Sequence, residues 1–313
     1  MQPTKPEKIT VVGAGLMGHG IAQVFADAGH AVAVHDPDPA ALARVPDRVG
    51  DIFRLLEADP APVELISLHE RLEDALEGAN FVIEAGPERV YVKREIFAAL
   101  DALTGPDVVL ASNTSAIPIR DIATKASNRA RILGAHFWNP PHFVPLVEVI
   151  QSDQTDIKFV KRTMDLLAGA GMSPVHVKRD IPGFIGNRLQ HALKREAIAL
   201  VASGVCDAET LDRVVTEGFG SRLGVLGPLE QSDMIGLGLT LDAHRVLIAD
   251  LDRTPGPHPL LEKKVTAGET GMAVGQGFRH WTPDQAAAVR KRFQEHLANE
   301  ARKRRSARGS AKA

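Results

Sequence analysis

Residues 8–36 read KITVVGAGLMGHGIAQVFADAGHAVAVHD, and this stretch decides the fold of the first half of the chain. Residues 9–12 and 31–35 are short apolar runs that predict strands, and residues 17–28 carry apolar side chains at helical spacing. The turn from the first strand into the helix has the pattern G-x-G-x-x-G at residues 13–18. There the first glycine permits a tight bend, the second lets the backbone approach a pyrophosphate, and the third lets the helix pack closely on the strand. The stretch therefore predicts a βαβ unit that binds a dinucleotide at the helix N-terminus.

Asp36 closes the second strand and selects the dinucleotide. It lies 18 residues after the last glycine of the turn, where a carboxylate accepts a hydrogen bond from a ribose 2′-hydroxyl and repels a 2′-phosphate. The next two residues, Pro37 and Asp38, supply no cation that would favour NADP. We therefore predict that NAD is the cofactor and that its binding residues include Gly13, Gly15, Leu16, Met17, Gly18 and Asp36.

The rest of the chain divides by its secondary-structure pattern. Up to residue 183, short apolar runs alternate with helical patterns, which indicates a mainly parallel sheet with helices on both faces. Beyond the breaker pair Pro182-Gly183 the pattern is helical with little strand character. We predict an α/β fold with an N-terminal Rossmann-type doubly wound domain at residues 1–183, an all-helical C-terminal domain at 184–300, and a disordered basic tail at 301–313.

The composition excludes several classes of protein. The net charge of the 313 residues is −2, so neither nucleic acid nor an anionic membrane surface is an expected partner. No apolar run reaches the length of a membrane span, and the N-terminus lacks the apolar core of a secretion signal. The single cysteine, Cys206, cannot form an intramolecular disulfide, and no Cys/His cluster has metal-ligand spacing. We expect a cytoplasmic protein without a bound metal.

A histidine and a glutamate occupy two neighbouring predicted strands. His136 ends one strand and Glu148 lies inside the next, with an Asn-Pro-Pro turn between them. If the strands pair about a centre near His142, His136 and Glu148 lie opposite each other on one face of the sheet. A carboxylate bonded to imidazole orients the ring and favours its protonated form, which suits a general base that accepts a proton from an alcohol. A purely structural His–Glu hydrogen bond that closes a hairpin is the alternative.

Two polar segments lie where ligands commonly bind. Residues 112–115, Ser-Asn-Thr-Ser, follow an apolar strand and so fall at the carboxyl edge of the sheet. Asn187 begins the first helix beyond the Pro182-Gly183 break, at the junction of the two predicted domains. Hydroxyl and amide side chains also commonly cap helices, so each segment has a structural interpretation as well. The residues alone leave both interpretations open.

The order of these motifs resembles that of the L-3-hydroxyacyl-CoA dehydrogenase family, from Lys8 to Trp281. The matching segments are VVGAGLMGHGIAQVFADAGH, FVIEAGPERVYVKREIF, ASNTS, HFWNPP followed by PLVEV, and PGFIGNRL. The resemblance implies NAD-dependent interconversion of an L-3-hydroxyacyl substrate and its 3-keto form. A 3-hydroxyacyl-CoA thioester is the expected substrate, with fatty acid metabolism as the setting.

The resemblance also implies roles by position. His136 would be the general base and Glu148 its partner, while Ser115 and Asn187 would bind the reacting oxygen of the small-molecule substrate. The further cofactor contacts that it implies, beside the nicotinamide ribose, are Glu88, Lys93 and Asn113.

Two regions depart from the pattern of enzymes that act on CoA thioesters. Residues 38–80, where such relatives are expected to bind CoA phosphates with basic residues, are short and contain no lysine. The segment NRLQHALKREAIALVASGV looks closer to the branch with carnitine dehydrogenases and λ-crystallin, which has L-gulonate dehydrogenase activity. A CoA-free 3-hydroxy acid such as L-gulonate or carnitine is therefore the alternative substrate, although HFWNPP and GMAVGQGFRHW favour the thioester.

A protein without catalysis is the remaining alternative, because a λ-crystallin serves as a bulk lens protein and a fold does not dictate a function. The family resemblance also implies a homodimer formed through the helical domain. The apolar segment Leu223–Gly227 suits such an interface, and it equally suits a buried loop between two helices.

Overall fold

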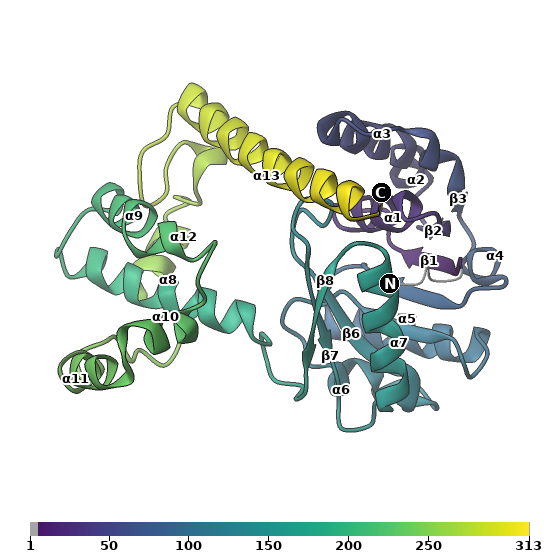
Figure 1. Cartoon of the computed structure of the whole chain (residues 1–313), viewed down its shortest axis with the longest axis horizontal. Helices are drawn as coiled ribbons and strands as arrows, with labels where there is room; N and C mark the ends of the chain where they lie inside the picture. The colour runs from purple at the N-terminus through teal and green to yellow at the C-terminus, as the bar shows by residue number, and fades with distance from the viewer. Residues whose placement is uncertain (1–5, 313) are drawn as a thin grey trace. The chain divides into compact units, whose positions relative to one another are not determined.

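The computed structural model of the chain describes residues 6–312, with side chains as far as residue 308 (Figure 1). It divides into two compact units. The first comprises the described residues up to Arg188 together with those from Phe293 onward, and the second comprises Leu189–Arg292. This division differs from the predicted domains chiefly because the C-terminal end of the chain belongs to the first unit.

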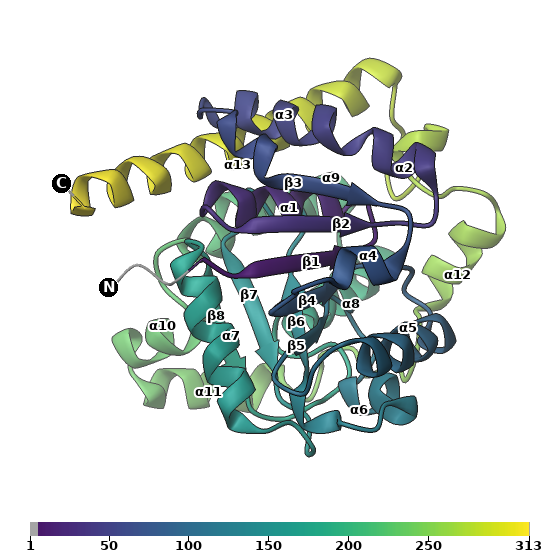
Figure 2. The same ribbon diagram turned by 90° about the vertical axis from the view of Figure 1, so that its right-hand side faces the viewer.

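Eight strands form one sheet in the first unit, in the order β3-β2-β1-β4-β5-β6-β7-β8. Neighbouring strands are parallel except β6 and β7, which run antiparallel. The order reverses at β1, which lies between β2 and β4, and ligands bind in the crevice at such a point in open α/β sheets. Figure 2 shows β3, β2 and β1 side by side. The strands are β1 Lys8–Val12, β2 Ala31–His35, β3 Ile66–His69, β4 Phe81–Glu84, β5 Val109–Ser112, β6 Ile132–Phe137, β7 Leu146–Ile150 and β8 Ser173–Val177.

Helices cover both faces of this sheet. Successive strand residues point to opposite faces, so Val11 packs in one apolar cluster with Phe25 of α1, and Val12 packs in another with Phe97 of α5. The predicted Rossmann-type α/β class is thereby confirmed. The helices of this unit before the domain break are α1 Gly18–Asp27, α2 Pro39–Ala43, α3 Val45–Leu56, α4 Leu72–Leu76, α5 Val90–Leu103, α6 Ile119–Ile122 and α7 Ile157–Gly169, with 3₁₀ turns at Ala61–Leu65, Ala123–Lys125 and Arg129–Arg131.

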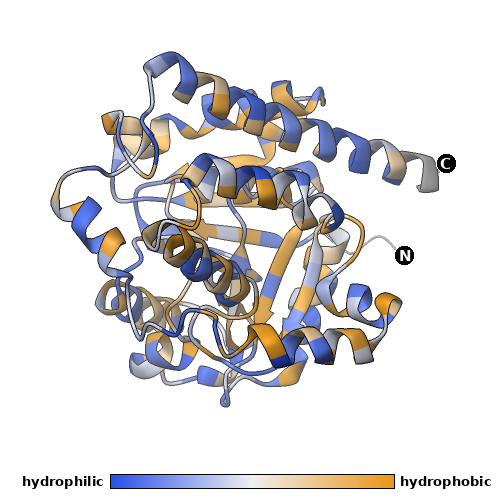
Figure 3. Ribbon diagram, turned by 90° about the vertical axis from the view of Figure 1, so that its left-hand side faces the viewer, coloured by the Kyte–Doolittle hydropathy of each residue, from blue (hydrophilic) through white to orange (hydrophobic). Residues whose placement is uncertain are grey.

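The second unit is helical, as predicted, and its apolar side chains are largely exposed. Val225 is 84% exposed and Leu229 is 79% exposed, so the apolar segment Leu223–Gly227 does not form a buried loop within this chain. Figure 3 shows apolar residues, in orange, along the helices of this unit. Its helices are α8 Gly186–Ala202, which begins in the first unit, α9 Ala208–Glu217, α10 Pro228–Ile235, α11 Leu237–Leu247 and α12 Pro259–Thr266, with 3₁₀ turns at Phe219–Arg222 and Met272–Val274.

The C-terminal helix α13, Pro283–Lys312, corrects the prediction of a disordered tail at 301–313. Its basic side chains bind the first unit: Arg302 donates from Nη2 to the backbone oxygen of Leu55 at 2.7 Å, and Arg305 forms an ion pair with the end of α1. Specific partners for these charges explain why the tail orders despite its low apolar content. The last residue of the chain lies outside the described residues. None of the described helices is both long enough and apolar enough to cross a membrane.

Candidate active site

The turn from β1 into α1 is shaped by its glycines. Gly13 has a φ of +109°, and a Cβ there would lie 2.8 Å from the backbone oxygen of Ala85. A Cβ on Gly18 would collide with the backbone oxygen of Gly13. Gly15 instead faces open space, with nothing within 4 Å of its Cβ position, and the neighbouring Leu16 is 68% exposed. The turn is therefore closed on the sheet side and open toward solvent, which fits a cofactor diphosphate on the backbone amides.

Asp36 is held against this turn. Its Oδ2 accepts a hydrogen bond from the backbone amide of Ala14 at 2.8 Å, and its Oδ1 accepts one from the amide of Asp38 at 2.9 Å. Each carboxylate oxygen retains a lone pair for a further donor. The side chain thus lies at the carboxyl edge of β2 beside the glycine turn, where the residues present fit an NAD ribose.

His136 and Glu148 face each other across the antiparallel pair β6 and β7. His136 Nδ1 lies 2.9 Å from Glu148 Oε2, and both side chains are buried. The other carboxylate oxygen, Oε1, accepts hydrogen bonds from the backbone amides of Ile185 and Gly186 at 2.9 and 3.0 Å. Burial would raise the pKa of Glu148, but the hydrogen bonds from His136 and from the two amides outweigh it and lower that pKa. An ionised carboxylate only accepts, so Nδ1 carries a proton, and in the neutral ring the lone pair is on Nε2.

Aromatic rings enclose the imidazole. The ring centroids of Trp138 and Phe184 lie 5.5 and 5.7 Å from that of His136. Phe184 is fully buried although its φ is +51°, a left-handed conformation that is uncommon for a bulky residue. The indole of Trp138 fills the space beside the α-carbon of Gly186, where any Cβ would collide with it. These contacts fix the ring plane of the histidine.

The loop after β5 is tied to its neighbours by side-chain hydrogen bonds. Glu88 Oε1 accepts from the Thr114 hydroxyl at 2.7 Å and from the Ser115 amide at 2.9 Å. Asn187 Nδ2 donates to the backbone oxygen of Ser115 at 2.9 Å, and Asn113 Oδ1 accepts from the amide of Phe137 at 2.8 Å. Ser115 is exposed and Asn187 is half-buried, so both have polar atoms free for a ligand.

The pKa of Glu88 reflects this arrangement. Burial raises it, but the Thr114 hydroxyl, the Lys93 ammonium and the amides of Ser115 and Ala116 together lower it. Glu88 is therefore an anion that organises the loop.

Lys93, which the resemblance places beside the nicotinamide ribose, is held by two carboxylates. Its side chain is 1% exposed, and its Nζ lies 2.8 and 2.9 Å from the two carboxylate oxygens of Glu84. It lies 3.5 Å from Glu88 Oε2, so it reaches the site through that carboxylate.

Glu84 is the site residue that sequence analysis missed. It ends β4 fully buried and also accepts from the Ser112 hydroxyl at 2.6 Å and the Gly86 amide at 2.7 Å. A carboxylate at the end of the apolar run Phe81–Glu84 was the available signal, because an unpaired charge there would be costly.

The four proposed catalytic residues lie along one chain of contacts in the first unit. His136 binds Glu148, Glu148 binds the amides at the start of α8, and α8 carries Asn187, which binds Ser115. The contact between Ser115 and Asn187 could not be predicted from sequence spacing, because the two residues are 72 positions apart. In the described part of the chain, no cluster of three or more His, Cys, Asp or Glu side chains is placed to hold a metal ion.

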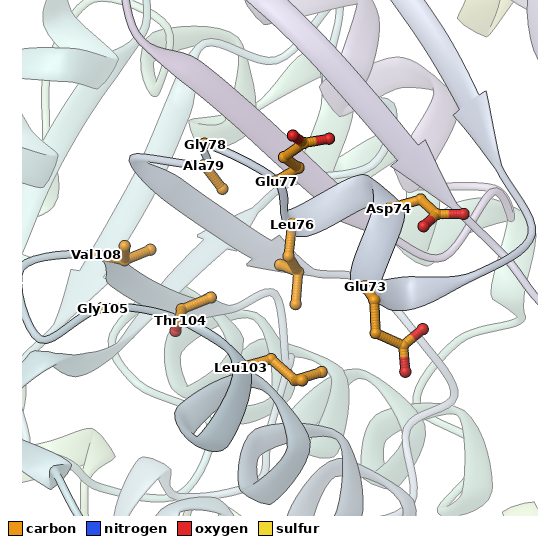
Figure 4. Close-up of a pocket in the computed structure, with 10 residues that line it drawn as sticks. All are labelled: Glu73, Asp74, Leu76, Glu77, Gly78, Ala79, Leu103, Thr104, Gly105 and Val108. Atoms are coloured by element: carbon orange, nitrogen blue, oxygen red, sulfur yellow. The ribbon is translucent and has the colours of Figure 1, made fainter.

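A pocket of about 500 Å³ lies elsewhere in the fold (Figure 4). It is lined by the loops that precede β4 and β5, including Glu77, Gly78, Thr104 and Gly105. These loops are at the amino ends of the strands, opposite the edge that carries Asp36 and Ser115. The pocket is therefore separate from the candidate active site.

Comparison with known proteins gives matches along most of the chain. Residues 8–181 match the family model of the 3-hydroxyacyl-CoA dehydrogenase NAD binding domain, and residues 183–281 match that of the C-terminal domain. The 5-formyl-3-hydroxy-2-methylpyridine 4-carboxylate 5-dehydrogenase of Mesorhizobium japonicum is 36% identical over 90% of this chain and 93% of its own. The L-carnitine dehydrogenase of Streptomyces coelicolor is 38% identical over 72% of this chain and 73% of its own.

Solved structures of two such enzymes superpose to different extents. The crystal structure of a 5-formyl-3-hydroxy-2-methylpyridine 4-carboxylic acid 5-dehydrogenase, an NAD⁺-dependent dismutase, has a TM-score of 0.88 at 33% identity and covers 96% of this chain and 99% of that chain. The (S)-3-hydroxybutyryl-CoA dehydrogenase of Ralstonia eutropha has a TM-score of 0.73 at 32% identity, covering 89% of this chain and 100% of that chain.

Proposed function

Because the chain belongs to the 3-hydroxyacyl-CoA dehydrogenase family and is thus an NAD-dependent dehydrogenase, we propose that it acts on the hydroxyl or carbonyl group of a small, CoA-free carboxylate, with His136 as the proton acceptor. The His136–Glu148 pair carries the catalytic part of this proposal. The packing of α13 on α3 is the observation that favours a CoA-free substrate.

The covered face of α3 argues against a CoA thioester. α3 belongs to the region after β2 that was expected to hold CoA phosphates, and it contains no lysine. Its residues Ile52 and Leu56 form an apolar cluster with Ala298 and Ala301 of α13. The end of the same helix binds Arg302, through the backbone oxygen of Leu55 and the carboxylate of Glu57. This face of α3 is therefore covered by α13 and is not available to bind CoA.

The comparisons support the same choice. The dehydrogenase that acts on a pyridine carboxylate has a TM-score of 0.88 to this chain, higher than the 0.73 of the 3-hydroxybutyryl-CoA dehydrogenase of Ralstonia eutropha. L-Carnitine dehydrogenases are also among the relatives. The pyridine carboxylate and carnitine are both carboxylates without a CoA group. Such substrates suit this chain, because the region expected to bind CoA is packed against α13.

In the proposed mechanism, His136 Nε2 accepts the proton of the substrate hydroxyl. Glu148, ionised and bonded to Nδ1, stabilises the imidazolium that results. The hydroxyl of Ser115 and the amide of Asn187 donate hydrogen bonds to the reacting oxygen, and these strengthen as negative charge develops on it. When bound, NAD supplies the hydride acceptor. In the opposite direction the protonated His136 returns its proton to the oxygen.

A turnover panel tests the substrate class. We expect NAD reduction with L-carnitine, L-gulonate, 3-hydroxybutyrate or a hydroxymethyl- or formyl-pyridine carboxylate, and no NADH oxidation with acetoacetyl-CoA. Turnover of acetoacetyl-CoA alone would reverse the assignment. His136→Gln should abolish turnover of the active substrate while NADH binding, followed by fluorescence, is retained.

A 3-hydroxyacyl-CoA thioester is the second candidate. The description of both matching family models favours it, as does the 37% identity to a 3-hydroxybutyryl-CoA dehydrogenase of Mycobacterium tuberculosis over 87% of this chain. The same catalytic residues would serve both substrates, so the two candidates differ only in what carries the hydroxyl group.

A homodimer formed through the second unit is also part of the proposal. Its helices expose large apolar side chains, among them Val225, Leu229 and Val246, each at least 75% exposed. Large apolar side chains exposed in such number on one unit are typical of an interface.

A further inference from the structure

His19, which bonds to the glycine turn, and Arg48 on α3 are basic side chains for which the described residues contain no carboxylate partner. His19 is the second residue of α1, and its Nδ1 lies 2.7 Å from the backbone oxygen of Gly15. Helical side chains lean toward the helix N-terminus, so this ring lies beside the turn, next to the open space that Gly15 faces. Because a carbonyl oxygen only accepts, Nδ1 is the protonated nitrogen and a neutral His19 presents a lone pair at Nε2.

Arg48 lies on α3, which packs against α1. It is half-buried, and no salt bridge to it occurs among residues 6–308. The aspartate one turn along α3, Asp51, is engaged by Arg54 instead. Arg48 is close enough to His19 to affect its titration: burial lowers the pKa of His19, the bond to Gly15 raises it, and the Arg48 charge lowers it again. Arg48 is a half-buried cation whose charge disfavours the protonated form of His19, and an anion bound near both side chains would offset this repulsion.

His142 is the other titratable group that faces His19. It lies in the turn between β6 and β7 and packs against Gly20, where its Nδ1 would be 3.0 Å from an added Cβ. Burial and the charge on His19 lower the pKa of His142 to about 4, so it is neutral near pH 7. It therefore adds no charge to the pair formed by His19 and Arg48.

We propose that His19 and Arg48 bind the diphosphate of the NAD cofactor beside Gly15, and that His19 takes up one proton as the cofactor binds. The neutral ring would repel a phosphate oxygen with its Nε2 lone pair, whereas the protonated ring donates an N–H to it. A diphosphate also offsets the repulsion between His19 and Arg48. The inference depends on the cofactor and not on the proposed substrate, because it concerns binding without turnover.

The sign of the resulting pH dependence follows from these charges. In the free protein the pKa of His19 is below its ordinary value, and the bound anion raises it. Binding thus consumes a proton in the pH interval between the two values, and affinity falls as the pH rises through that interval. One proton allows at most a tenfold change in Kd per pH unit.

Calorimetric titration with ADP-ribose and with adenosine, between pH 6 and 8.5, tests the proposal. Repeating it in buffers of different ionisation enthalpy counts the protons taken up. For the unmodified protein we expect proton uptake and a Kd for ADP-ribose that rises about threefold or more per pH unit, with neither effect for adenosine, which lacks the diphosphate. ADP-ribose binding without proton uptake would overturn the proposal, even if no variant were made.

Variants of His19 and Arg48 test which side chain causes the pH dependence of ADP-ribose binding. His19→Gln should weaken ADP-ribose binding and remove its pH dependence, and Arg48→Gln should weaken binding across the pH range, while adenosine binding is unchanged in both. His176→Gln is the matched control, because burial also lowers the pKa of His176 but it lies on β8 and bonds to Gln151. A His19→Gln variant that keeps the affinity and pH dependence of the unmodified protein would refute the role of His19.

Discussion

At the scale of single residues, Glu148 has two tasks that require both of its oxygens. One oxygen holds His136 Nδ1 at 2.9 Å, and the other accepts two amides at the start of α8. The first task determines which imidazole nitrogen carries the proton. The second links the catalytic pair to the segment that carries Asn187.

Glu148→Gln separates these tasks. The amide oxygen can still accept from the backbone, but the amide nitrogen donates to Nδ1 and forces the proton of His136 onto Nε2. His136 then cannot accept a proton from the substrate, so we expect kcat to fall by about 10²–10⁴-fold, the usual contribution of a general base. Steady-state kinetics with the substrate identified by the panel measures this loss. NADH affinity should stay unchanged, and an unaltered kcat would contradict the assigned tautomer.

His142 gives a prediction about stability and pH. Its pKa is lowered from 6.5 to about 4 in the folded chain, chiefly by burial and then by the charge on His19. Below pH 6.5 the unfolded chain binds this proton and the folded chain does not, so the folded state loses free energy of unfolding as the pH falls toward 4. One such group contributes at most about 1.4 kcal/mol per pH unit.

His142→Phe should remove this pH-dependent loss of stability, because phenylalanine keeps an aromatic ring at this position but has no group that takes up a proton. Urea unfolding at pH 7.5 and 5 measures the difference. The free energy of unfolding of the unmodified protein should fall further between the two pH values than that of the variant. Equal falls would show that His142 titrates normally in the folded protein.

At the scale of elements, α13 is the part of the chain that departs most from expectation. Its segment after residue 300 is basic and poor in apolar residues, which is typical of a disordered tail. It is helical because Ala298 and Ala301 are small enough to pack on α3, because Arg302 bonds to the backbone oxygen of Leu55 on α3, and because Arg305 pairs with Asp27 at the end of α1. Amino-acid composition reports the average polarity of the segment, whereas the packing of α13 depends on a few residues on one face of the helix.

Arg302→Ala should weaken this docking. The loss of a charged hydrogen bond to Leu55 and of the pair with Glu57 corresponds to about 1 kcal/mol at a partly exposed site. We expect faster amide hydrogen exchange in α3 and in the last turns of α13. Lys303→Ala is the control, since Lys303 is 73% exposed and pairs with Glu300 on the same helix. Equal exchange in the two variants would indicate that Arg302 does not hold the helix.

At the scale of the whole molecule, the two units bury apolar surface to very different degrees. The first contains almost all of the described core residues, and helices α9 to α12 contain none. A unit of this size that buries so little of its apolar surface is expected to bury it against another chain.

Val225→Glu combined with Leu229→Glu tests the proposed homodimer. Two charges on an apolar interface should convert the dimer into a monomer, or raise its dissociation constant by 100-fold or more. Light scattering coupled to size-exclusion chromatography measures the mass. Leu65→Glu, an exposed position in the first unit, should leave the mass unchanged. A monomeric unmodified protein would refute the proposal directly.

The sequence alone determined the βαβ unit and the pairing of His136 with Glu148. Both depend on local rules: residue periodicity identifies strands and helices, glycines identify the turn, and the strands β6 and β7 that pair are neighbours in the chain. For the same reason the sequence predicts that Asp36 binds the cofactor, and its carboxylate accepts the amide of Ala14 in the glycine turn.

Only the tertiary structure decided the features that join distant segments. It buried Lys93 on Glu84, brought Asn187 to Ser115 and packed α13 on α3. Contacts of this kind depend on how helices and loops pack over the sheet, and no local period in the sequence encodes that packing. The sequence therefore determined what the cofactor region is, and the tertiary structure decided which side chains surround it.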